Sequence, residues 1–172
     1  MTDSSLSTTR LAAWLDHRLD LSIGFHMPAA RLYGIVVNDL ERLEDDHAAA
    51  RTSFIAEDRD TYALLIGSCA VLARSFDAAA VVTTGWAAPM LADGSMTHRP
   101  SRHPERRRVR AVAVVDSEGV ASVLRFEDQP DVSTAMPAGD GAMVEAMVRM
   151  WHGLDADIVN LRTTRGPCAR RP

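Results

Sequence analysis

The chain has 172 residues, of which 47% are apolar and 24% charged, and its formal net charge at pH 7 is -4. This length and composition are typical of one globular domain and argue against a disordered chain. No apolar run approaches the roughly 20 residues of a membrane helix. The first ten residues lack the layout of a signal peptide. We therefore expect one domain over residues 1–162, a flexible tail over 163–172, a cytoplasmic location and no membrane contact.

Arginine is the only strongly basic residue, because lysine is absent. Arginine makes bidentate contacts with carboxylates and phosphates better than lysine does, so the bias is open to a functional interpretation. Codon usage in a GC-rich bacterial genome explains it more simply, since alanine is also abundant and the total charge is acidic. The two cysteines, Cys69 and Cys168, form no CxxC motif and fit a reducing compartment. The composition thus favours a bacterial cytoplasmic protein.

The first half of the chain has the residue spacing of helices. Residues 7–20 carry a stripe of leucine and tryptophan on one side of a helix, and residues 28–49 carry Leu32, Val36, Leu40, Leu43 and His47 on one face, three or four positions apart. Residues 59–76 are apolar nearly all round, which is typical of a buried helix. We expect three helices here, the third being central to the fold.

A β-hairpin is the clearest element of the second half. Residues 109–115 and 120–126 are rich in valine and flank a polar turn that ends in Gly119, which tolerates a positive φ. Residues 78–86 form an earlier β-branched run that predicts another strand.

A methionine-rich stripe over residues 140–154 predicts a C-terminal helix, and residues 157–162 predict a further short strand. Because helices do not separate most of the strands, the sheet should be mainly antiparallel. We therefore expect an α+β fold in which N-terminal helices accompany a small sheet of three or four strands, with the C-terminal helix packed on it.

The connection over residues 87–105 is where we expect function to lie. Long loops inside compact domains are uncommon, and many of them bind partners. His98, His103 and Glu105 are metal-ligand types, but their spacing matches no established metal pattern, so we predict no metal and no cofactor. Trp86 ends the preceding strand and could line a ligand pocket beside this connection.

An arginine cluster leads into the hairpin. Arg106, Arg108 and Arg110 alternate with Arg107, so a strand would direct the three to one face, and Arg102 lies just before them. Such a row could bind phosphate, a nucleic-acid backbone or an acidic partner. Carboxylates within the fold could equally neutralise it. Because aromatic residues make up only 5% and the net charge is acidic, nucleic acid ranks below a protein partner.

Catalytic signatures are missing: the sequence has no GxxxxGK[ST], GxGxxG, GxSxG or HExxH. We therefore predict a binding or regulatory domain that engages a protein partner or a second copy of itself, and we assign no catalytic residues. One alternative is a small enzyme or ligand-binding protein that uses the 87–105 loop, and another is a nucleic-acid backbone binder that uses residues 102–110. The candidate binding residues are Trp86, His98, His103, Arg102, Arg106, Arg108 and Arg110.

Overall fold

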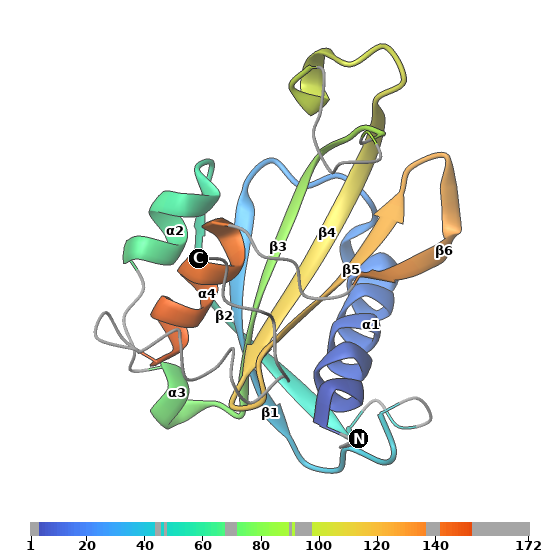
Figure 1. Ribbon diagram of the computed structural model, residues 1–172. Helices are drawn as coiled ribbons and strands as arrows, with labels where there is room; N and C mark the ends of the chain where they lie inside the picture. Colours follow the sequence, from blue (N-terminus) through green and yellow to red (C-terminus); the bar gives the residue numbers. More distant parts are fainter. Residues whose placement is uncertain are drawn as a thin grey trace.

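The computed structural model describes residues 4–43, 46, 48–67, 72–89, 91, 98–136 and 142–152. These residues form three layers, in which a six-stranded sheet separates one long helix from a group of shorter ones (Figure 1). The helices are α1 (Ser4–Ile23), α2 (Thr61–Gly67), α3 (Leu72–Ser75) and α4 (Ala142–His152), with a 3-10 turn η1 (Pro100–Arg102). The strands are β1 (Ala30–Val37), β2 (Ala50–Asp58), β3 (Ala78–Ala87), β4 (Arg107–Asp116), β5 (Val120–Phe126) and β6 (Gln129–Met136).

The strand order in the sheet is β2-β1-β3-β4-β5-β6, and all pairings among the described strands are antiparallel. The last four strands follow one another along the chain and across the sheet. The β1–β2 hairpin is added on the other side, where β1 pairs with β3. The two edges of the sheet are therefore β2 and β6.

Helix α1 covers one face of the sheet, where it contacts β4 and β5. Its apolar stripe, including Leu11, Leu15 and Leu19, is buried against sheet residues such as Val112 and Val114. The predicted helix over residues 7–20 is confirmed, and it is this helix, rather than the one expected over 59–76, that forms the long helical cover of a sheet face, over β4 and β5.

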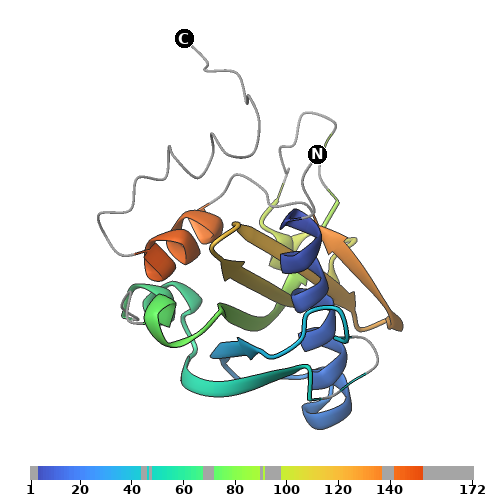
Figure 2. The same cartoon turned by 90° about the horizontal axis from the view of Figure 1, so that it is seen from below.

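The other face carries α2, α3 and α4, and Figure 2 shows these helices and α1 on opposite sides of the strands. Leu65 of α2 and Met147 and Trp151 of α4 share a second buried cluster with Val81 and Val115 of the sheet. The predicted C-terminal helix is therefore confirmed, as is its packing on the sheet.

The predicted hairpin is also confirmed, as β4 and β5. Gly119 closes its turn with φ of 144°, a value that side chains disfavour. One carboxylate oxygen of Asp116 accepts hydrogen bonds from the backbone amides of Glu118 and Gly119, and the other accepts one from the Thr8 hydroxyl at 2.8 Å. The turn is thus tied to the start of α1.

The helix expected over residues 28–49 is wrong, because the chain there forms β1 and the connection to β2. Residues i and i+4 share a face in a strand as well as in a helix, so the spacing of Leu32 and Val36 fits either structure. Strand β1 lies inside the sheet with apolar residues on both faces, and it therefore shows no alternation of polar and apolar residues.

The expected strand number is also wrong, since the sheet has six strands and not three or four. The missed strands are β1, β2 and β6. Every residue of β6 is exposed, so this edge strand has no buried face to mark it in the sequence. The α+β class and the antiparallel sheet are confirmed.

The helix expected over residues 59–76 contains α2 and α3, while residues 68–71 between them lie outside the described part. Burial on most sides is wrong for α2, because Tyr62 and Ile66 are exposed. The strand expected over 157–162 and the tail over 163–172 also lie outside the described residues. None of the helices in the described part is long and apolar enough to cross a bilayer.

Candidate functional site

Strands β3 and β4 extend beyond their neighbours in the sheet. β3 pairs with β1 only as far as Val82 but with β4 as far as Ala87, and β4 begins to pair with β5 at Val109. The last two pairs of the β3–β4 ladder, Trp86 with Arg108 and Ala87 with Arg107, form a two-stranded ribbon with neither β1 nor β5 paired alongside, and this ribbon projects from the sheet with η1 near its end (Figure 1). At about 3.3 Å per residue, residues 83–87 reach about 17 Å beyond β1. We call residues 83–87 and 98–108 the arm.

Trp86 lies at the centre of the arm. It pairs directly with Arg108 in the β3–β4 ladder, and the Arg108 guanidinium lies 4.8 Å from the centre of the indole ring. The Arg106 guanidinium lies 5.0 Å from the same ring. Trp86 is 37% exposed, so the ring and its two cations reach the surface. These contacts hold the arginines by cation–π attraction and leave guanidinium N–H groups available to other acceptors.

Arg107 points to the opposite face, as the alternation along the strand predicts, and its charge is neutralised. Its Nε and Nη2 donate hydrogen bonds to the carboxylate of Asp128, and its guanidinium lies 4.0 Å from the centre of the Phe126 ring. The hydrogen bonds from Arg107 hold the pKa of Asp128 below its ordinary value, and Asp128 in turn raises the pKa of Arg107. Arg107 is therefore already occupied.

Three arginines of the arm have no such counter-charge among the described residues. Within the part of the chain that the structure describes, no carboxylate lies within 4 Å of the guanidinium of Arg102, Arg106 or Arg108. Arg102 is exposed on η1, Arg106 is exposed, and Arg108 is half-buried. The arm thus presents positive charge to solvent on a molecule whose net charge is negative.

The two histidines of the arm lie next to each other, with ring centres 6.0 Å apart in an edge-to-face arrangement. His103 Nδ1 accepts a hydrogen bond from the Glu105 amide at 3.1 Å, and the His103 carbonyl accepts one from Arg106 Nη1 at 3.4 Å. His103 therefore shapes the approach to β4 and helps to position Arg106. Among the described residues, no group of three or more histidine, cysteine or acidic side chains is close enough to hold a metal ion.

Arg110 does not belong to this surface, which corrects the expectation of three exposed arginines on one face. Its side chain is fully buried beneath α1, where it forms an ion pair with Asp16. It also donates a hydrogen bond to the Gly24 carbonyl at 2.6 Å and another to Asp20 at 3.1 Å. These contacts use its donors within the fold, so the exposed cluster ends at Arg108.

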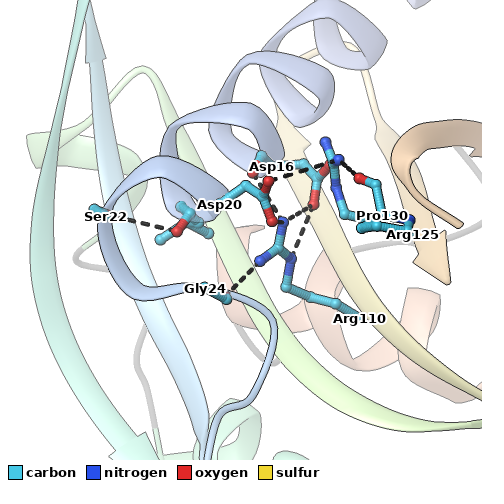
Figure 3. A network of polar contacts seen from close by, with 8 residues as sticks. Asp16, Asp20, Ser22, Gly24, Arg110, Arg125 and Pro130 are labelled. Carbon is cyan, nitrogen blue, oxygen red and sulfur yellow. Dashed lines mark hydrogen bonds and ion pairs between the residues drawn. The ribbon is translucent and has the colours of Figure 1, made fainter. Parts of the chain in front are cut away.

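A second buried arginine joins this network, which is drawn in Figure 3. Arg125 of β5 binds the Asp16 Oδ2 atom through its Nε at 2.8 Å and Nη2 at 2.7 Å, while Arg110 binds Oδ1. Arg125 Nη1 also donates to the Pro130 carbonyl. Two aspartates and two arginines balance in charge, and no buried side-chain donor or acceptor among the described residues lacks a partner. The network fastens α1 to β4 and β5.

The sequence analysis missed the acidic half of this network. Asp16 and Asp20 lie four residues apart on α1, directly beside the buried Leu15 and Leu19. An aspartate beside an apolar stripe is usually solvated, so the sequence carries no local signal that Asp16 is buried. Once buried, an unpaired carboxylate would be costly, and the two arginines remove that cost.

A separate hollow of about 290 Å³ lies along α1, away from the arm. It is at the small end of the range for ligand pockets. Its lining residues are Arg10, Ala13, Trp14, His17 and Leu43. The guanidinium of Arg18 lies 5.3 Å from the centre of the Trp14 ring. None of the predicted binding residues lines this hollow.

No protein-family model, curated protein sequence or solved structure matches the chain. We therefore describe the class of this protein by its fold and by the arm. It is an α+β protein with a six-stranded antiparallel sheet, from which a cationic ribbon built around one tryptophan projects.

Proposed function

We propose that this chain is a non-catalytic binding domain that recognises an acidic segment of a protein partner through the arm. The observation that carries the proposal is the pairing of Arg106 and Arg108 with the exposed Trp86 ring, where neither arginine has a carboxylate partner within the described residues. We propose a bacterial cytoplasm as its setting.

The contrast with Arg107 supports this function. Of the three consecutive arginines, Arg107 alone has a carboxylate partner among the described residues. Arg106 and Arg108 are held by an aromatic ring instead, which reduces the side-chain entropy lost on binding. A guanidinium in that state is suited to bidentate contact with a carboxylate that comes from outside.

A nucleic-acid backbone is the second candidate, and Trp86 is the observation in its favour, because an exposed ring beside arginines can stack on a base. A single such ring provides little surface for a strand. The net charge of -4 also repels the part of a long nucleic-acid strand that extends past the arm, more than it repels a short acidic segment held by the arm. An acidic peptide segment needs only a few carboxylates near Arg102, Arg106 and Arg108, which suits the size of the arm.

The enzyme or ligand-binding alternative has less support. His103 uses its Nδ1 atom and its carbonyl to hold the backbone and Arg106. Trp86 contacts two arginines rather than lining the hollow on α1. A binding domain needs none of the catalytic geometry that such a site would require.

A binding assay tests the proposal. The fluorescence anisotropy of a labelled glutamate-rich dodecapeptide and of a labelled single-stranded DNA would be followed against protein at low ionic strength. We expect peptide binding that R106Q/R108Q weakens about tenfold or more, since each charge-assisted bond contributes about 1 kcal/mol or more. R107Q is the matched control and should bind like the wild type.

Peptide binding that R107Q and R106Q/R108Q reduce equally, or that neither reduces, would contradict the proposal. Stronger binding of the DNA than of the peptide would favour the nucleic-acid candidate instead.

A further inference from the structure

Strand β2 is an open edge of the sheet with apolar side chains on it. Phe54 is 56% exposed, and Ile55 beside it is 36% exposed. An edge strand offers unpaired backbone N–H and C=O groups, so an exposed apolar edge is a template for another strand. The edge at β6 differs in carrying Pro130 near its start, which has no backbone N–H to offer to a further strand.

The two faces of β2 follow from its register with β1. Tyr33 pairs with Phe54 and Leu32 with Ala56, which leaves Ile55 as a bulged residue between them. Tyr33 belongs to the core under α1, and Leu32 to the core under α2 and α4. Side chains therefore alternate between the faces, with a change of phase at Ile55. The α1 face holds Ala50, Thr52, Phe54 and Glu57, and the α2 face holds Arg51, Ser53, Ala56 and Asp58.

This pattern is complementary to itself when the strand is reversed. When the bulged Ile55 is left out, Thr52 and Glu57 are each two residues from Phe54, and both lie on the α1 face. Arg51 and Asp58 are each three residues from Phe54, and both lie on the α2 face. In an antiparallel pair, residues directly opposite each other lie on the same face. A second β2 strand would thus bring Arg51 opposite Asp58 twice, with Phe54 opposite itself at the centre.

We propose that two copies of this chain associate through β2, antiparallel and about a two-fold axis at Phe54, into one continuous sheet. A shift of the register by two residues would place Phe54 opposite Glu57 or Thr52 and would separate Arg51 from Asp58, so apolar contact and charge both favour the register above. Helix α2 contacts β2, and its Tyr62 and Ile66 are 46% and 75% exposed. They provide exposed apolar surface beside the new pair of strands on the α2 face, opposite to the face that carries Phe54.

Sedimentation velocity over a range of protein concentrations tests this interface. The wild type should reach a dimer, and F54K should stay monomeric, since it places two like charges at the axis. R51D should weaken the dimer about tenfold, because two symmetric attractions become repulsions. D58R should do the same, and the double exchange R51D/D58R should restore the dimer. R149D on α4 is the control, and circular dichroism verifies that each variant is folded.

A wild type that is monomeric at every concentration would overturn the proposal. So would a dimer that F54K and the single charge reversals leave intact, since such a dimer would use another surface. The interface does not depend on the arm, so R106Q/R108Q should leave the sedimentation unchanged.

Discussion

Arg108 lies directly across the β3–β4 ladder from Trp86, and its guanidinium lies 4.8 Å from the centre of the indole ring. Opposite residues of an antiparallel pair share a face, so the register of the ladder alone brings this cation to this ring. Arg106 approaches the same ring at 5.0 Å from the end of the strand. The function proposed for the arm depends on this arrangement.

Loss of Asp16 should destabilise the protein strongly. Among the described residues, the variant D16A leaves Arg110 and Arg125 beneath α1 with Asp20 as their one remaining carboxylate. Removing one partner of a buried ion pair typically costs about 3–5 kcal/mol. Urea unfolding followed by far-UV circular dichroism should show a loss of this size. D128A, which breaks the exposed pair with Arg107, should have a much smaller effect, and equal effects would contradict the account.

Gly34 of β1 should not tolerate a side chain. A Cβ built at Gly34 would lie 2.6 Å from ring carbons of Phe76, closer than real contacts allow. We expect G34A to lower the free energy of unfolding by about 1–3 kcal/mol, the usual cost of overpacking. F76L removes the ring, so G34A should lower the free energy of unfolding much less in the F76L background than in the wild type.

G85A is the matched control for this prediction, since Gly85 also lies in a strand but a Cβ there meets no atom within 4 Å. Thermal unfolding measures all four variants. If G34A and G85A had the same midpoint, the contact between Gly34 and Phe76 would not be tight.

The ion pair between Arg107 and Asp128 should be visible as a pH effect. The folded protein holds the pKa of Asp128 below its ordinary value of about 3.9, so the pair stabilises the fold above that pH. Its contribution is lost as the pH falls through the lowered pKa, because the unfolded carboxylate takes up its proton first. Carboxyl NMR titration should show R107Q raising the pKa of Asp128. An unchanged titration would contradict the contact.

Much of the fold could be predicted wherever local pattern and burial agree. The β-branched runs at residues 78–86, 109–115 and 120–126 form β3, β4 and β5. The helical spacing of apolar residues in α1 and α4 correctly predicts these two helices. Strand β1 could not be recognised, because the spacing of its apolar residues fits a helix as well as a strand and because both of its faces are buried. Strand β6 has no buried face at all.

The residues of the arm could be predicted from the sequence, but the contacts between them could not. The sequence singles out Trp86, Arg106 and Arg108, but their contact depends on the register that pairs position 86 with position 108. Arg110 has the same alternation as Arg108, yet it is buried because α1 brings Asp16 to it across 94 positions of sequence. No local pattern carries that information.

The most direct measurement of the central claim is an NMR titration of the three tryptophan indole N–H signals with the glutamate-rich peptide. Trp14 and Trp151 are buried in the two cores, whereas Trp86 lies on the arm beneath two arginines. We predict that the Trp86 signal, assigned with W86F, shifts with added peptide, that the other two stay in place, and that R106Q/R108Q abolishes the shift. Peptide binding that leaves the Trp86 signal unmoved would contradict the claim that the arm is the binding surface.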